Sequence, residues 1–109
     1  MTRQGTTMRK RRQPRAIWQQ TRQQIWLRDQ GRCQGPYCRD QPANSLPLQK
    51  AHIDHVMALS HGGTNANSNL RTLCRRCHAL RACKSHQGLI APALRDGIIP
   101  AAWRQWVWE

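Results

Sequence analysis

Three residues in the middle of the chain, one carboxylate and two histidines, have the side chains that metal-assisted hydrolysis needs: Asp54, His55 and His78. Asp54 and His55 are adjacent, Asn69 lies fourteen positions beyond His55, and His78 lies nine positions beyond Asn69. A carboxylate and an imidazole can share one divalent cation and still leave coordination positions for water and phosphate oxygens. Another imidazole can accept a proton near neutral pH. On a basic protein, these residues predict metal-assisted cleavage of a nucleic-acid backbone.

The cysteines predict a structural metal site beside these residues. Cys33 and Cys38 form a C-x4-C pair. After 35 intervening residues, Cys74 and Cys77 form a C-x2-C pair, which completes the two-knuckle pattern of a tetrahedral four-cysteine zinc site. Two disulfides in a secreted domain are the alternative, but the first residues lack the apolar segment of a signal peptide. We expect the fifth cysteine, Cys83, to be a buried free thiol.

The length and composition of the chain give such a site a structural purpose. With 109 residues, 39% of them hydrophobic, the chain should form one domain with a small core. Zinc binding is therefore expected to supply much of the folding free energy. No apolar run approaches the roughly 20 residues that a membrane-spanning helix requires. We expect a soluble, cytoplasmic protein with no membrane partner.

The charge of the chain points to a polyanionic partner. Eighteen Lys and Arg residues face five acidic residues, and the formal net charge is +13. Fifteen of the eighteen are Arg, whose planar guanidinium group suits phosphate. A merely solvated surface usually mixes both signs of charge, and a membrane-surface protein would carry its basic residues on an amphipathic helix. Neither pattern is present, which favours nucleic acid.

The candidate residues fall on a predicted hairpin and on the helix that follows it. Residues 48–53 and 69–73 have the composition of short strands, separated by a loop that contains Gly62 and Gly63. Residues 75–84 follow as a helix. The predicted fold class is therefore α+β, with a small two-strand and one-helix core stapled by the four-cysteine zinc site.

The flanking segments are expected to differ from this core. Residues 1–14 are basic and poor in large apolar residues, which predicts a disordered arm. Residues 15–29 have helical spacing of apolar side chains, and residues 88–95 form another short helix. Pro100 suits the first turn of a last helix. This helix would hold three tryptophans, which we expect to pack as core, with a stacking surface for unpaired bases as the alternative: Trp103, Trp106 and Trp108.

Several motifs at fixed spacing resemble the HNH endonucleases of the ββα-metal fold, specifically the small zinc-stapled type found in bacteria and phages. The resemblance covers about residues 33–84. It implies a bacterial or phage-encoded protein of the host cytoplasm. Together with the flanking elements read above, it leads us to expect a nuclease domain over residues 15–87 and a helical extension, residues 88–109, packed on that domain. The motifs are Ala51-His-Ile-Asp-His-Val56, Gly62-Gly63, Asn69-Leu-Arg-Thr-Leu-Cys74 and Cys77-His78.

The resemblance implies a role for each candidate residue. Asp54 and His78 would bind the catalytic divalent metal, Mg²⁺ or Mn²⁺, although such a site can also accept Ni²⁺ or Zn²⁺. His55 would be the general base, and Asn69 would hold the loop of His55. The products would be a 5′-phosphate and a 3′-hydroxyl. The structural Zn²⁺ would be held by Cys33, Cys38, Cys74 and Cys77.

Two positions depart from the family pattern, and one histidine has an open role. The family often has Pro where this chain has Ala58, and often Lys where it has Arg81. Neither change removes a reacting group. His52 shares a strand face with Asp54 and could be a third metal ligand, a substrate contact or a structural residue.

The partner expected from the resemblance is double-stranded DNA. The basic side chains around the presumed cleft would contact phosphates and so give little sequence preference. A non-catalytic zinc module that binds nucleic acid, or an accessory subunit of a larger nuclease or packaging complex, remains the alternative. Nicking or double-strand cleavage, and a monomer or a homodimer, are both compatible with the sequence. The expected phosphate contacts are Arg71, Arg75, Arg76, Arg81 and Lys84.

Overall fold

A two-stranded antiparallel hairpin lies at the centre of the protein. The computed structural model describes residues 13–38, 45–81 and 88–109. Strand β2 (His52–His55) pairs with strand β3 (Leu70–Leu73). In this register the two strands place the Asp54 Cα opposite the Arg71 Cα. The hairpin register alone therefore brings an acidic and a basic side chain together.

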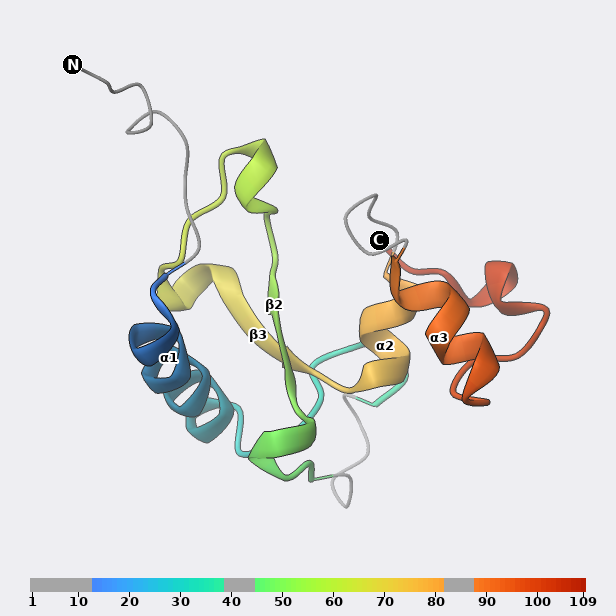
Figure 1. Cartoon of the computed structure of the whole chain (residues 1–109), viewed down its shortest axis with the longest axis horizontal. Helices are drawn as coiled ribbons and strands as arrows, with labels where there is room; N and C mark the ends of the chain where they lie inside the picture. Colours follow the sequence, from blue (N-terminus) through green and yellow to red (C-terminus); the bar gives the residue numbers. More distant parts are fainter. Residues whose placement is uncertain (1–12, 39–44, 82–87) are drawn as a thin grey trace.

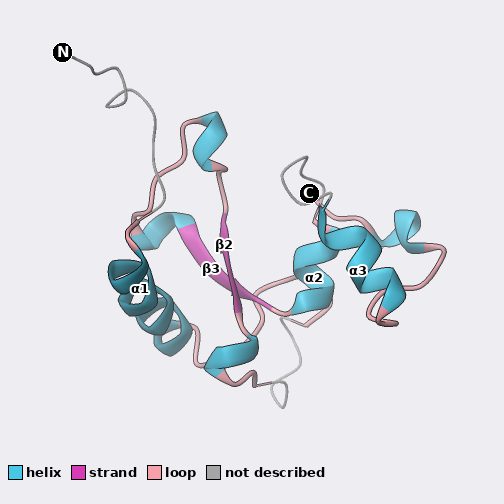
Figure 2. Ribbon diagram, in the orientation of Figure 1, coloured by secondary structure: helices cyan, strands magenta, loops and turns pink. Residues whose placement is uncertain are grey.

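Helices flank the hairpin on two sides. Helix α1 (Arg15–Arg28) packs against both strands from one side, and α2 (Arg75–Leu80) packs against them from the other (Figure 1). Helix α3 (Ile90–Arg95) packs on α2. Figure 2 shows the two strands of the hairpin between α1 and α2. The predicted α+β class, with two strands followed by a helix, is confirmed.

Within the described residues, the core is divided into three small apolar clusters. One surrounds the cysteines, one joins α2 to α3, and one joins α1 to the hairpin. Leu73 and Ile25, for example, are fully buried but belong to different clusters. Small separate clusters contribute little hydrophobic stabilisation each. A metal ion that links these segments would therefore add stability that the apolar clusters do not supply.

Several predicted elements have different bounds in the structure, and the strand from residue 48 and the helix over residues 75–84 differ clearly. The strand expected from residue 48 begins only at His52, because Leu48–Lys50 form a 3₁₀ turn. The guanidinium of Arg22, on α1, donates to the Leu48 and Ala51 carbonyls, at 3.0 and 2.8 Å. These hydrogen bonds satisfy two carbonyls at the 3₁₀ turn. The helix expected over residues 75–84 ends at Leu80.

Arg81 leaves the helix because its backbone is extended and pairs with Trp108 in an isolated bridge.

The last helix, which was expected to begin near Pro100 and to include Trp108, is also shorter than predicted. Only Trp103–Trp106 are helical, and they form a 3₁₀ turn. Trp103 and Trp108 pack on the α2–α3 cluster, as expected of core residues. Trp106 does not, because 46% of it is exposed.

Some expectations fall on residues outside the described part of the chain. The basic arm, residues 1–14, has only its last two residues within it, and Cys83 and Lys84 lie outside it. Among the helices that are described, none combines the length and the apolar character needed to cross a membrane.

Candidate functional site

The four cysteines predicted to bind zinc come together in the structure. All four Sγ atoms lie within 4.8 Å of one another, and they are free thiols rather than disulfides. The Sγ of Cys38 lies 3.8 Å from that of Cys74 and 3.9 Å from that of Cys77. A tetrahedral zinc ion with Zn–S bonds of about 2.3 Å places its sulfurs about 3.8 Å apart. The donor set and its spacing therefore fit zinc.

Backbone amides and neighbouring thiols prepare these sulfurs for a cation. The Gly35 amide donates to Cys33 Sγ at 3.3 Å, and the Cys77 amide donates to Cys74 Sγ at 3.4 Å. Hydrogen bonds from the Cys33 and Cys77 thiols lower the pKa of Cys74 to about 2. The hydrogen bond to Cys74 in turn raises the pKa of Cys33 to about 12. Zinc would displace the remaining protons, since thiolates are its ligands.

Gly35 should be essential to this arrangement. A Cβ at residue 35 would lie 2.6 Å from both Cβ and Sγ of Cys77. We expect Gly35→Ala to push the two knuckles apart and lower the zinc affinity about 10- to 100-fold, as other changes beside metal ligands do. Competition with a coloured chelator measures this affinity. Gly88→Ala is the matched control, because nothing lies within 4 Å of a Cβ there. Equal zinc affinity in the two variants would contradict the expectation.

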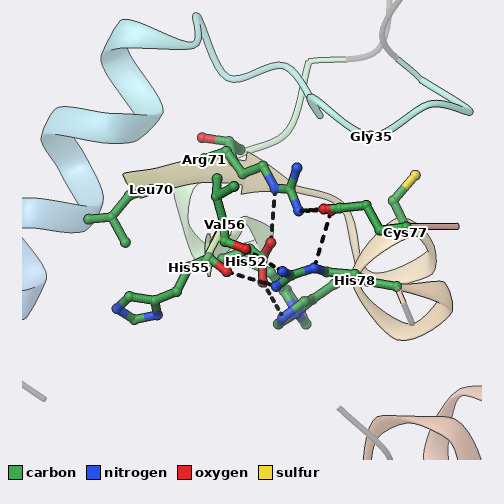
Figure 3. Close-up of polar contacts among 12 residues, drawn as sticks. Gly35, His52, His55, Val56, Leu70, Arg71, Cys77 and His78 are labelled. Atoms are coloured by element: carbon green, nitrogen blue, oxygen red, sulfur yellow. Dashed lines mark hydrogen bonds and ion pairs between the residues drawn. The ribbon is translucent and has the colours of Figure 1, made fainter. Parts of the chain in front are cut away.

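The Asp54 carboxylate forms a second, buried centre between the hairpin and α2. Its side chain is 1% exposed. Oδ2 accepts from Arg71 Nε at 2.9 Å, and Oδ1 accepts from Arg81 Nη1 at 2.9 Å (Figure 3). Nε2 of His78 lies 3.6 Å from Oδ1. Burial raises the pKa of Asp54, but the His78 hydrogen bond and the two guanidinium charges outweigh it and hold that pKa below its ordinary value. Asp54 is therefore ionised at neutral pH.

His52 pairs with His78 rather than standing apart. The two Nδ1 atoms are 2.8 Å apart, and the rings are nearly perpendicular. Burial and, after it, the charge of His78 lower the pKa of His52, so His52 stays neutral. A neutral His52 can accept the Nδ1 proton of His78. The Nε2 of His78 then faces Asp54, and a cation bound between them would take the place of the Nε2 proton. Asp54 and His78 are thus placed as a pair that could hold a divalent cation, with His52 orienting the imidazole.

The His55 ring points away from Arg71 and His78, toward α1 (Figure 3). There it stacks on Trp18, with centroids 5.7 Å apart and planes within 6°. Its Nε2 lies 2.8 Å from the Oδ1 of Asn65. Because an amide oxygen only accepts, Nε2 carries the proton and Nδ1 the lone pair. Sequence reasoning missed both partners, since Trp18 reads as a core residue and Asn65 as an ordinary loop residue.

Asn69 ties the loop after His55 to the start of β3. Its Oδ1 accepts from the Met57 amide at 2.8 Å. Its Nδ2 donates to the carbonyls of Met57, at 2.9 Å, and Thr64, at 2.8 Å. Gly63 passes so close to this loop that a Cβ would lie 1.8 Å from the Met57 carbonyl oxygen. The loop is therefore held by one amide side chain and one close backbone approach.

The basic residues expected to contact phosphate have different surroundings. Arg75 forms a 2.7 Å ion pair with Asp96, and both side chains are more than a third exposed. Arg76 donates to the Sγ of Cys38 at 3.5 Å, so its charge lies beside a candidate zinc ligand. Lys84 is outside the described residues.

Arg71 and Arg81 belong to the Asp54 centre and also contact Glu109. Arg71 Nη2 donates to both carboxylate oxygens of Glu109, at 2.7 and 2.9 Å. Arg81 Nε lies 3.5 Å from Glu109 Oε2. The Arg71 guanidinium also lies over the Trp108 ring, 4.9 Å from its centroid. No sequence motif marks these contacts, because they join positions far apart in the chain.

Comparison with known proteins identifies the domain that contains both centres. The model of one family, HNH endonuclease, matches residues 33–82. Searches of the curated proteins and of the solved structures gave no match. The matched range runs from the first zinc-ligand candidate through the hairpin and α2, and it includes Asp54 and His78. An HNH domain implies a nuclease-type function on nucleic acid. The protein therefore carries a domain of the HNH endonuclease family.

Proposed function

We propose that this protein is a metal-dependent endonuclease that hydrolyses DNA phosphodiester bonds and leaves 5′-phosphate and 3′-hydroxyl ends. The observation that carries the proposal is the pairing of Asp54 and His78, 3.6 Å apart, between the hairpin and α2. One ionised carboxylate and one imidazole form a small ligand set, so phosphate oxygens and water can complete the coordination of a cation. We expect Mg²⁺ or Mn²⁺, with Ni²⁺ or Zn²⁺ as further possibilities.

The chain's own residues divide the work of hydrolysis. Asp54 and His78 would hold the cation, which when bound stabilises charge on the phosphate and on the leaving oxygen. The Nδ1 lone pair of His55 would take the proton of the attacking water. Because the His55 ring points to the α1 side, the base and the metal ligands would face a bound phosphate from different directions. In-line displacement requires attack opposite the leaving oxygen, which this separation suits.

The positions of the other residues support the same assignment. Trp18 and Asn65 fix the plane and the tautomer of His55. Asn69 holds the loop that follows it. The guanidinium of Arg81 donates to the His55 carbonyl at 2.7 Å and so links the base to the Asp54 centre. A base that is held on several sides loses little freedom when the substrate binds.

A non-catalytic, zinc-stapled nucleic-acid-binding module is the second candidate. The observation in its favour is that Arg71 and Arg81 both bind Asp54, as they would bind a purely structural carboxylate. On that reading Asp54 would balance two buried cations and bind no metal. The same protein could then serve as an accessory subunit of a larger nuclease or packaging complex.

Relaxation of supercoiled plasmid by the zinc-loaded protein separates the two candidates. We expect nicked or linear DNA with Mg²⁺ or Mn²⁺ and intact plasmid in the same buffer with no added metal. A chelator is unsuitable as the control because it would also strip the structural zinc. DNA ligase should seal the nicks, since it requires a 5′-phosphate and a 3′-hydroxyl. Binding without cleavage under every metal would favour the non-catalytic module.

His52→Ala tests the role of the histidine pair. Without its partner, the His78 ring can rotate and change tautomer, so we expect about 10- to 100-fold weaker affinity for the catalytic cation. The Mn²⁺ concentration that gives half-maximal cleavage measures this change. His61→Ala is the matched control, because His61 is exposed in the following loop. An unchanged Mn²⁺ requirement in His52→Ala, with normal zinc content, would remove His52 from the site.

A further inference from the structure

Arg71 and Arg81 present an anion-binding surface that Glu109 covers. Only 16% of the Arg71 side chain and 10% of the Arg81 side chain are exposed, whereas Glu109 is 35% exposed. Arg71 uses Nε for Asp54 and Nη2 for both oxygens of Glu109. The two arginines therefore lie between a buried carboxylate and an outer one.

The outer position has the chemistry of a phosphate subsite. Guanidinium groups bind carboxylates and phosphates with the same planar hydrogen-bonding geometry. Glu109 presents two oxygens to Arg71 and lies near Arg81, as two non-bridging oxygens of a phosphodiester could. The inner carboxylate, Asp54, is the candidate metal ligand. Arg71 would thus bridge an anion in the place of Glu109 and the carboxylate that is proposed to hold the catalytic cation.

The neighbouring tryptophan, Trp108, fixes the backbone that carries Glu109. The Trp108 amide donates to the Leu80 carbonyl at 3.1 Å, and its indole Nε1 donates to the Cys77 carbonyl at 2.8 Å. These bonds fix the backbone before Glu109 to α2. The Glu109 side chain can therefore rotate away while Trp108 stays in place under the Arg71 guanidinium.

We infer that Arg71 and Arg81 form a subsite for a phosphate of the bound nucleic acid, and that Glu109 is an intramolecular competitor for it. Without nucleic acid, the two arginines face two carboxylates and their charges balance. When Glu109 is displaced, one positive charge becomes available to a phosphate beside Asp54. This inference rests on the proposed function, because it assumes that nucleic acid binds at the Asp54 centre.

The test compares DNA binding by charge variants that cannot cleave. Each variant is made in a His55→Ala background, loaded with zinc and titrated against a short fluorescent DNA duplex at low salt with no added Mg²⁺ or Mn²⁺. Glu109→Gln removes the competing charge. Glu109→Asp keeps the charge but shortens its reach by one methylene. Asp96→Asn is the matched control, since it removes a similarly exposed acid that also pairs with an arginine, Arg75.

We expect Glu109→Gln to bind DNA about threefold to fivefold more tightly than the Glu109 parent, the gain that a partly exposed ion pair allows. Glu109→Asp should give a smaller gain, and Asp96→Asn should gain less than Glu109→Gln. An equal gain in Glu109→Gln and Asp96→Asn would mean that only net charge matters, and would overturn the inference. Equal binding by all variants would overturn it while leaving DNA as the partner. No DNA binding by any variant would remove the proposed function as well.

Discussion

Removal of zinc should unfold the protein, and this is the largest effect that we expect of any single change. Structural zinc sites contribute apparent binding free energies of about 10–16 kcal/mol at neutral pH, as large as the whole stability of an ordinary domain. Here the cysteines join the segment from Cys33 to Cys38, the end of β3 and the start of α2. The three apolar clusters are too small to hold these segments together alone.

The measurement is a titration with a strong chelator, followed by circular dichroism and tryptophan fluorescence. We expect loss of helical signal together with a change in tryptophan emission, because Trp108 packs on the cysteine cluster. Added Zn²⁺ should restore both signals, and added Mg²⁺ should not, since Mg²⁺ avoids thiolate ligands. Cys77→Ser should reproduce the chelated state. A cooperative thermal transition that is unchanged by the chelator would show that the cysteines are not a structural metal site.

The sequence predicted the parts of the structure that depend on local spacing. Two cysteine pairs with knuckle spacing allow few other arrangements, and the structure places their sulfurs at tetrahedral zinc distances. The hairpin and α1 follow from apolar periodicity and from the turn residues that bound them. The match of residues 33–82 to the HNH endonuclease family confirms the resemblance carried by those motifs.

The sequence could not predict contacts that depend on tertiary packing. Arg71 and Glu109 meet only because Trp108 pairs with the chain just after α2, and nothing in the local pattern marks that bridge. Trp18 has helical spacing typical of a core residue, yet its ring also stacks on His55. The bounds of α2 were wrong for a related reason, since the backbone of Arg81 becomes extended to pair with Trp108.

The contacts that the sequence could not predict lie mainly around the proposed catalytic centre. The types and the order of Asp54, His55 and His78 were readable in the sequence, whereas the orientation of each ring was not. Each ring direction depends on a partner from another segment: Asn65 for His55, and His52 for His78. Candidate site residues can thus be proposed from a motif, but their tautomers and accessible faces come from the fold.

His55→Ala should abolish most cleavage while the protein still folds and binds DNA. Removal of a general base typically costs about 10²- to 10⁴-fold in rate. Folding should survive because His55 is only half-buried, and Asp54, which lies in the buried ion-pair network, is untouched. The measurement is the single-turnover rate of plasmid nicking with Mn²⁺, beside DNA affinity and thermal stability for the same preparation. His61→Ala is the matched control in the neighbouring loop and should retain the native rate.

The nicking rate and the thermal stability together distinguish a general-base role of His55 from a packing role or a metal-binding role. If His55 only filled space against Trp18, the variant would lose thermal stability and would nick DNA at nearly the native rate. If it bound the cation, raising the Mn²⁺ concentration would recover the lost rate, because weak binding can be saturated. A missing base cannot be replaced in this way, so the rate should stay low at every Mn²⁺ concentration. Native-like nicking by His55→Ala would therefore remove His55 from the chemistry and leave Asp54 and His78 to act without it.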